Sequence, residues 1–123
     1  MRPYGKELIL DIHGCSPLRF SRESIENYFI SLCNEIDMTR GPLYFWDYEG
    51  EPEEYAVAPS HLKGVSAIQF ITTSNITIHT LDDLKRVYLN IFSCKDFNAE
   101  HVCKFSKGWF DGEIVNSKEM ERI

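Results

Sequence analysis

The sequence predicts an α+β fold, a two-layer sandwich in which an antiparallel β-sheet has two helices packed on one face. Three observations predict this class. Several stretches alternate apolar and polar residues, which indicates half-buried strands. Two other stretches carry apolar residues at helical spacing. Consecutive strand-like stretches also follow one another too closely for crossover helices, so we expect antiparallel pairing. The 123 residues suffice for a single domain, residues 1–123, with one core.

The N-terminal part predicts a strand, a helix and a second strand. Leu8, Leu10 and Ile12 alternate with more polar neighbours up to His13, as in a half-buried strand. Ser21 suits the N-cap of a helix that runs to about Asp37. The apolar stripe of this helix comprises Ile25, Tyr28, Phe29, Leu32, Cys33 and Ile36. A second strand is expected within residues 41–49, and the acidic segment 47–55 reads as a loop because it contains Gly50 and Pro52.

Three strand-like runs follow at residues 64–72, 74–80 and 86–94. The break at Thr73 leaves room only for a tight turn, so the first two runs should form an antiparallel pair. A second helix is expected from Asn98 to about Lys107, and an edge strand over residues 108–115. The charged C-terminal end is expected to fray.

Composition narrows the class of function. The net charge is −6 and the 13 basic residues are scattered, so we expect no nucleic-acid partner. No apolar run approaches the roughly 20 residues of a membrane span. Asp11 and His13 interrupt the first apolar run, which argues against a signal peptide, and we expect a cytoplasmic protein. An acidic surface can favour a small cationic ligand, although it can also be merely solvated.

The cysteines at positions 15, 33, 94 and 103 predict neither a metal site nor a disulfide framework. They form no CxxC pair, and we expect no metal cofactor. Three of the four are expected to be small buried side chains. The fourth is a candidate for chemistry, because a thiol titrates within reach of neutral pH.

Polar residues could meet where neighbouring strands of the sheet lie side by side. In the run from Ser74, the alternation puts Ile76 and Ile78 on one face and Asn75, Thr77 and His79 on the other. In the last run, Tyr88, Asn90, Phe92 and Cys94 share a face, and Ser66 lies near the start of the run leading to Ser74. A Ser/His/Cys cluster is geometrically possible, as is the alternative that these are ordinary polar residues of a sheet.

Four motifs carry a family resemblance. They are His13-Gly14-Cys15, Gly64-Val65-Ser66, the run from Ser74 to Thr80 with sequence SNITIHT, and Ile91-Phe92-Ser93-Cys94. Ser66 precedes Ser74 by eight residues, His79 follows it by five and Cys94 by twenty. In this order and spacing the motifs resemble the bacterial and archaeal S-adenosylmethionine decarboxylases, which process themselves to form a pyruvoyl cofactor. The resemblance covers about residues 7–105 and leaves 108–123 as a C-terminal extension.

The resemblance implies a role for each matching residue. Ser74 would attack the carbonyl of Thr73, and His79 would accept the Cα proton of residue 74, so that cleavage between Thr73 and Ser74 leaves a pyruvoyl group. This group would form a Schiff base with the substrate amine. Cys94 matches the general acid, and Ser66 a residue that supports processing. The family also implies a homodimer with sites near the subunit interface.

The sequence departs from the family pattern at three places. Thr73 stands where the family usually has glutamate. Leu81-Asp82-Asp83 replaces a tryptophan, proline and glutamate, so Asp83 could bind the ribose hydroxyls whereas Leu81 offers no aromatic face for adenine. Many relatives carry an aromatic residue a few positions before Gly64, where the stretch Pro59 to Lys63 offers only the ring of His61, although Trp46 or Tyr48 could substitute.

These departures leave three functions open. The first is decarboxylation of S-adenosylmethionine for the synthesis of spermidine and other polyamines. The second is decarboxylation of a smaller cationic amino acid, arginine or ornithine, which needs Ser74, His79 and Cys94 but no adenine site. The third is an unprocessed homologue without catalytic activity. Intact-mass analysis of the purified chain separates the first two from the third.

Overall fold

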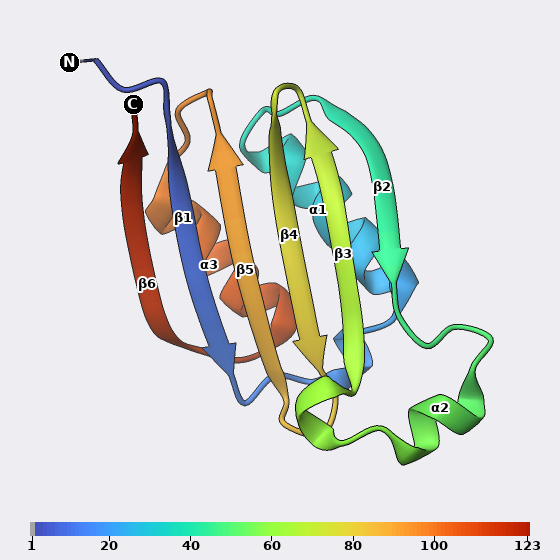
Figure 1. Cartoon of the computed structure of the whole chain (residues 1–123). Coiled ribbons are helices and arrows are strands. Elements are labelled where there is room, and N and C mark those ends of the chain that lie inside the picture. The colour runs from blue at the N-terminus through green and yellow to red at the C-terminus, as the bar shows by residue number, and fades with distance from the viewer. Residues whose placement is uncertain (1) are drawn as a thin grey trace.

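The computed structural model describes residues 2–123 and confirms the predicted two-layer α+β sandwich. One layer is an antiparallel sheet, and the other consists of α1 (Arg22–Glu35) and α3 (Ala99–Phe110), which lie behind it in Figure 1. The six strands of this described part are β1 (Gly5–His13), β2 (Arg40–Trp46), β3 (Gly64–Ile71), β4 (Ser74–Leu81), β5 (Arg86–Ser93) and β6 (Glu113–Arg122). Their order across the sheet is β2-β3-β4-β5-β1-β6.

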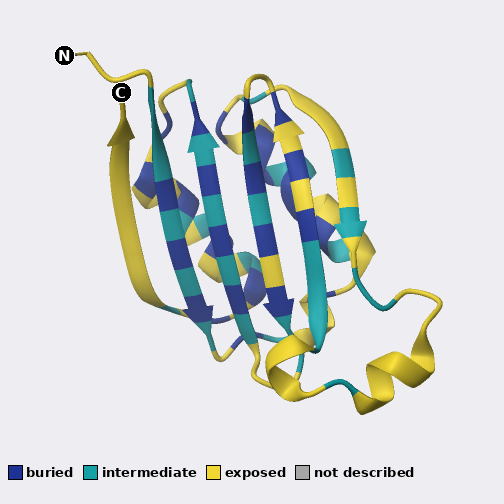
Figure 2. Ribbon diagram, viewed as in Figure 1, coloured by how far each residue is buried: buried dark blue, intermediate teal, exposed yellow. Residues whose placement is uncertain are grey.

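The core lies between the sheet and the two helices. Every second residue of the central strands is buried, as the alternating bands in Figure 2 show. Tyr28 of α1 is fully buried against Phe110 of α3, with ring centroids 4.9 Å apart. Its hydroxyl lies 2.7 Å from the hydroxyl of Ser106, so the buried polar group has a hydrogen-bond partner. No helix of residues 2–123 covers the opposite face of the sheet, which is called the open face below.

The predicted helix starts are confirmed. Ser21 caps α1, because its side chain accepts a hydrogen bond from the amide of Ser24 at 3.1 Å. Asn98 caps α3 in the same way by accepting from the amide of His101 at 3.0 Å. Both helices therefore begin after the capping residue that the sequence indicated.

The segment 47–55 was predicted to be a loop, and that prediction is wrong in part. It contains the start of a short helix, α2 (Pro52–Val57), followed by a 3₁₀ turn at Ser60–Leu62. Pro52 occupies the first turn of α2, where its missing N–H costs no hydrogen bond. In Figure 1, α2 lies beyond the end of the sheet where β2 ends and β3 begins.

The C-terminal elements also differ from the prediction. Helix α3 continues to Phe110 instead of ending near Lys107, because burial of Phe110 against α1 stabilises an extra turn. The predicted strand at 108–115 therefore starts only at Glu113. It continues to Arg122, where the guanidinium pairs with Glu7 at 2.7 Å, and β6 lies along β1 as an edge strand. The expected fraying of this end is wrong. Within residues 2–123 no helix is long and apolar enough to cross a membrane.

Candidate active site

The predicted site residues form two groups at opposite ends of β4. Ser74 is the first residue of this strand and His79 lies five residues further on. At about 3.3 Å per residue, this separates their backbones by roughly 17 Å. Ser74 also belongs to the buried face, whereas His79 is exposed on the open face. The single Ser/His/Cys cluster considered from the sequence therefore does not form within one chain.

The first group surrounds the turn between β3 and β4. Ile71 pairs with Ser74, which leaves only Thr72 and Thr73 in the turn. Thr73 has a φ of 54°, in the left-handed region that a β-branched residue rarely adopts. The Ser74 side chain is buried at 7% exposure, and its Oγ accepts a hydrogen bond from the amide of Cys94 at 3.0 Å. The bond between Thr73 and Ser74 thus lies in a strained turn beside a fixed serine hydroxyl.

Cys94 lies next to the same turn. Its Sγ is 3.0 Å from Oγ1 of Thr73 and 3.8 Å from the carbonyl oxygen of Thr72. The Thr73 hydrogen bond, followed by one from Ser74, lowers the pKa of the Cys94 thiol from its ordinary 9.0. Ser74 and Cys94, twenty residues apart in the chain, are therefore brought together by the pairing of β4 with β5.

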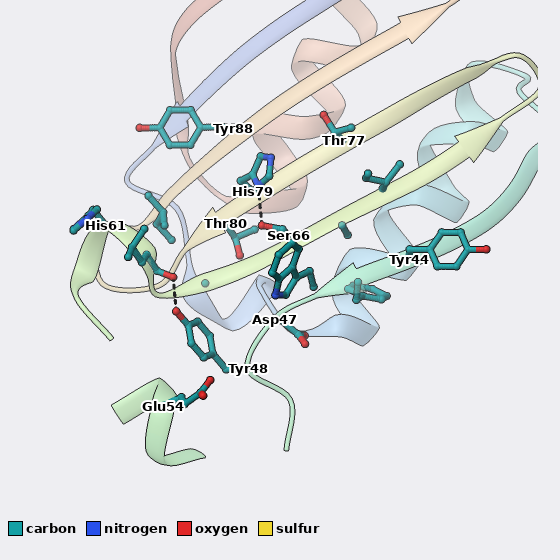
Figure 3. Close-up of a pocket in the computed structure, with 17 residues that line it drawn as sticks. Tyr44, Asp47, Tyr48, Glu54, His61, Ser66, Thr77, His79, Thr80 and Tyr88 are labelled. Carbon is teal, nitrogen blue, oxygen red and sulfur yellow. Dashed lines mark hydrogen bonds between the residues drawn. The ribbon is translucent and has the colours of Figure 1, made fainter. Parts of the chain in front are cut away.

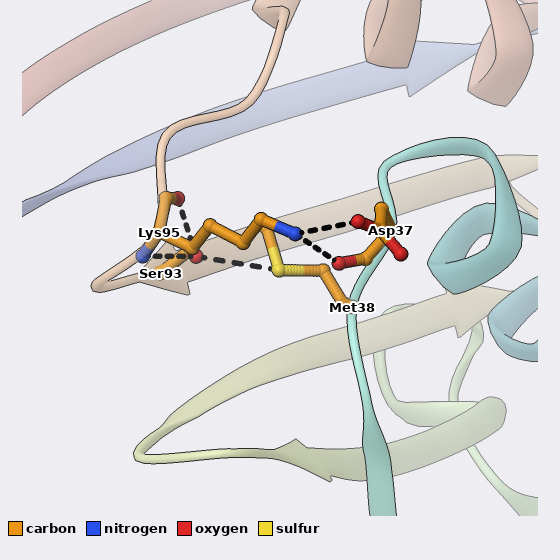
Figure 4. Close-up of polar contacts among 4 residues, drawn as sticks. All are labelled: Asp37, Met38, Ser93 and Lys95. Atoms are coloured by element: carbon orange, nitrogen blue, oxygen red, sulfur yellow. Dashed lines mark hydrogen bonds and ion pairs between the residues drawn. The ribbon is translucent and has the colours of Figure 1, made fainter.

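Residues on both sides of Cys94 are anchored (Figure 4). Lys95 donates from Nζ to the carbonyl oxygen of Asp37 at 2.6 Å and to its carboxylate at 2.9 Å. The hydroxyl of Ser93 accepts from the Lys95 amide at 3.0 Å and donates to the Lys95 carbonyl at 2.7 Å. Ser93 Oγ also lies 3.6 Å from the sulfur of Met38. The Lys95 ion pair lowers the pKa of Asp37. These contacts tie the Cys94 loop to the segment that joins α1 and β2.

The second group forms a row across the open face. Trp46 of β2 pairs with Ser66 of β3, Ser66 with His79 of β4, and His79 with Tyr88 of β5. Ser66 Oγ lies 2.7 Å from Nδ1 of His79, a hydrogen-bond distance shown in Figure 3. Directly opposite residues on one face of a sheet contact each other, so this row follows from the register.

A cavity of about 1140 Å³ lies over this row (Figure 3). Trp46, Tyr48 and His61 line it, which places there the three rings considered as adenine partners from the sequence. Leu81 lines it as well. The other lining residues are Tyr44, Phe45, Asp47, Glu54, Leu62, Gly64, Ser66, Ala67, Ile68, Thr77, His79, Thr80 and Tyr88. The lining thus includes several aromatic side chains and the His79–Ser66 pair.

Asp83 does not line this cavity. Its carboxylate accepts a hydrogen bond from Ser60 at 3.0 Å and lies 3.8 Å from Nζ of Lys63. Its neighbour Asp82 accepts from the hydroxyl of Tyr55, which raises the pKa of Tyr55 to about 12. Both carboxylates thus hold the segment around α2 against the turn that follows β4.

The sequence indicated some contributors only in part and missed another. Glu54 was noted only as part of the acidic segment 47–55, and it lines the cavity from α2. Lys95, which lies outside the motifs, was missed. The Thr73 hydroxyl was noted only as a departure from the family pattern. For Lys95 the only available signal was its position after Cys94.

Two of the four cysteines are buried, whereas three were expected from the sequence. Cys15 and Cys33 are buried, and burial raises the pKa of each to about 11; Cys94 and Cys103 are partly exposed. No group of three or more His, Cys, Asp or Glu among the described residues could hold a metal ion.

The fold is shared with a protein of known structure. The structure resembles the crystal structure of the adenosylmethionine decarboxylase from Aquifex aeolicus, with a TM-score of 0.78. The alignment covers 99% of this chain and 92% of the other at 14% identity, so it shows a shared fold. The arrangement of one sheet and two helices is therefore the same in the two proteins.

Sequence comparison identifies the family. The family model described as S-adenosylmethionine decarboxylase matches residues 6–123. S-adenosylmethionine decarboxylase proenzymes from Clostridium tetani and Thermoanaerobacter pseudethanolicus are 24% and 25% identical, each over 99% of this chain and 89% and 90% of their own length. The chain belongs to the S-adenosylmethionine decarboxylase family, whose members are pyruvoyl-dependent carboxy-lyases.

Proposed function

We propose that the protein cleaves itself between Thr73 and Ser74 and then decarboxylates S-adenosylmethionine. The observation that carries this proposal is the geometry of the strained turn. Thr73 has a positive φ, the Ser74 hydroxyl is held by the amide of Cys94, and the thiol of Cys94 contacts Thr73. A nucleophile, a strained scissile bond and a titratable thiol are thus adjacent.

In the processing reaction, Ser74 Oγ attacks the carbonyl carbon of Thr73. A C–O bond forms, the C–N bond breaks, and the hydroxyl proton passes to the released nitrogen. Loss of the Cα proton of residue 74 then eliminates the ester, so that residues 1–73 leave with a new terminal carboxylate. Addition of water and loss of the nitrogen as ammonia leave a pyruvoyl group on the fragment 74–123. His79 is the proposed acceptor of the Cα proton.

The residues around Ser74 fit such a group. When present, the pyruvoyl carbonyl supplies an electron-withdrawing centre for the negative charge left as carbon dioxide departs. Cys94 lies beside it with a lowered pKa, and we assign to this thiol the return of a proton to the substrate carbon. The amide of Cys94 remains available as a hydrogen-bond donor once the Ser74 hydroxyl has been consumed.

For His79 to accept the Cα proton of residue 74, a second copy of the chain must supply it, because the two residues lie too far apart within one chain. We propose that two copies pack through their open faces, related by a two-fold axis that crosses the middle of β4 perpendicular to the strand. Such an axis places the start of one β4 over the end of the other, and packed sheets lie only about 10 Å apart. Cys94 and the Thr73–Ser74 turn of one copy would then lie over the second copy's His79 and Ser66.

The exposed side chains of the open face support this assembly. Tyr44 and Trp46 are 62% and 85% exposed, and Ile68 and Phe70 are 41% and 44% exposed. These four residues lie on neighbouring strands, β2 and β3, and Tyr44 pairs directly with Ile68. A contiguous apolar patch on an uncovered sheet face is typical of an interaction surface. A second copy would bury it and complete the site at once.

A smaller cationic substrate, arginine or ornithine, is the second candidate. The observation that favours it is the environment of Asp83, whose carboxylate is already held by Ser60 and Lys63 outside the cavity. In this arrangement Asp83 does not reach the position expected of a ribose ligand. Trp46, Tyr48 and Tyr88 favour S-adenosylmethionine instead, since their rings offer stacking surfaces for adenine.

Intact-mass analysis of the freshly purified protein tests the proposal. We expect two fragments, residues 1–73 and 74–123, with a pyruvoyl terminus on the second. Ser74→Ala should leave the chain intact, and Ser106→Ala, which changes a buried serine of α3, should still cleave. Release of carbon dioxide from S-adenosylmethionine, arginine and ornithine, assayed in parallel, identifies the substrate. A wild-type chain that stays whole after long incubation would refute self-processing.

A further inference from the structure

The charges around the cavity are unbalanced. Its lining contains two carboxylates, Asp47 and Glu54, and no lysine or arginine. Asp47 is already neutralised, because Arg22 donates to it from Nε at 2.8 Å and from Nη2 at 2.7 Å. This pairing lowers the pKa of Asp47. Glu54 forms no ion pair with any described residue, and its carboxylate is therefore the one uncompensated charge of the lining.

Glu54 is an exposed residue that lines the cavity. It comes from α2, and Figure 3 shows its carboxylate beside Tyr48 on the side of the cavity. Two hydrogen bonds hold this region in place: Tyr48 donates to the carbonyl oxygen of Leu62 at 3.0 Å, and Tyr55 donates to Asp82. These bonds fix the tyrosines that precede and follow Glu54 in the chain. Glu53, the preceding residue of α2, is exposed like Glu54 but does not line the cavity.

We propose that Glu54 is a specificity-determining residue that recognises the positive charge of an organic cation in this cavity. Aromatic faces and a carboxylate together favour a sulfonium, guanidinium or alkylammonium group over a neutral group of the same shape. The faces come from Trp46, Tyr48 and Tyr88. The inference rests on the proposed function for its site and assigns the chemical class of the substrate side chain.

Binding to the full-length Ser74→Ala protein tests this inference without turnover. Isothermal titration calorimetry would compare two pairs of nearly isosteric ligands. S-adenosylmethionine and arginine carry the side-chain cation, and S-adenosylhomocysteine and citrulline are their neutral counterparts. In at least one pair, the cationic member should bind about tenfold more tightly. The pair that binds also separates the two candidate substrates.

Substitution of Glu54 supplies the decisive comparison. In the Ser74→Ala background, Glu54→Gln should abolish most of the preference for the cation, and Glu53→Gln should retain it. An unchanged preference in the Glu54→Gln protein, equal binding of cationic and neutral ligands before substitution, or no binding of either pair would overturn the inference. The mass analysis of the wild-type protein is a separate test. If the chain never cleaves but still prefers the cationic ligand in a Glu54-dependent way, only the proposed reaction is refuted.

Discussion

Ser74 and His79 belong to the same strand but lie at its opposite ends and on opposite faces of the sheet. No rotamer change closes a backbone separation of roughly 17 Å. The hydrogen-bond partner of His79 is Ser66, and that of Ser74 is the amide of Cys94. The proposed reaction, which uses both residues, therefore has to take them from different copies of the chain.

Co-expression of two inactive variants checks this arrangement. Ser74→Ala and His79→Ala should each fail to cleave alone. In a mixed dimer, the His79→Ala copy supplies Ser74 and the Ser74→Ala copy supplies His79, so one site is complete. We expect cleavage of up to about half of the His79→Ala chains, given that copies pair at random. Mass spectrometry with a tag on one variant measures this, and the absence of cleavage in the mixture would contradict a shared site.

The backbone strain at Thr73 should accelerate processing. Left-handed backbone costs an L-residue about 1–2 kcal/mol, and glycine escapes this cost. Thr73→Gly and Thr73→Ala both lose the hydroxyl, but only alanine keeps a Cβ. We expect the alanine variant to cleave several-fold faster and to unfold at a slightly lower temperature. Time-resolved mass analysis and thermal denaturation measure both effects, and equal cleavage rates would show that strain contributes nothing.

The ionisation of Cys94 should depend on Thr73. Because the Thr73 hydrogen bond is the largest cause of the lowered pKa, its removal should raise that pKa toward 9.0. The thiolate then forms only at higher pH, and the pH midpoint of alkylation shifts upward. Thr73→Val, which keeps the β-branch, is suited to this test in the uncleaved Ser74→Ala background. Iodoacetamide labelling followed by peptide mass analysis measures it, with Cys103 as the internal control. An unchanged midpoint would contradict the assignment.

Lys95 should act by positioning Cys94. Lys95→Met removes the tie to Asp37, and displacement of the thiol should lower turnover on the order of tenfold. The ion pair is exposed to solvent and contributes little to stability, so the melting temperature should change little. Lys95→Arg should restore most of the activity, and Lys104→Met, which breaks the Glu100 pair on α3, should leave turnover unchanged. A loss equal in all three variants would exclude a positioning role.

The sequence by itself determined the fold class and the strand faces. Alternation is a local property, so the burial of Ile76 and Ile78 opposite His79 could be predicted without any tertiary contact. The N-caps at Ser21 and Asn98 are local in the same sense. The order and spacing of Ser66, Ser74, His79 and Cys94 also indicated the family.

Only the tertiary structure decided how these residues group. Strand register pairs Ser66 with His79 and brings Cys94 to Ser74, and register depends on partners far away in the chain. Packing of Phe110 against Tyr28 extended α3 beyond its predicted end. The hydrogen bond from Ser60 to Asp83 and the position of Glu54 both depend on the fold of the segment around α2. Such long-range contacts leave no periodic signal in the sequence, and they separate one expected cluster into two groups of residues.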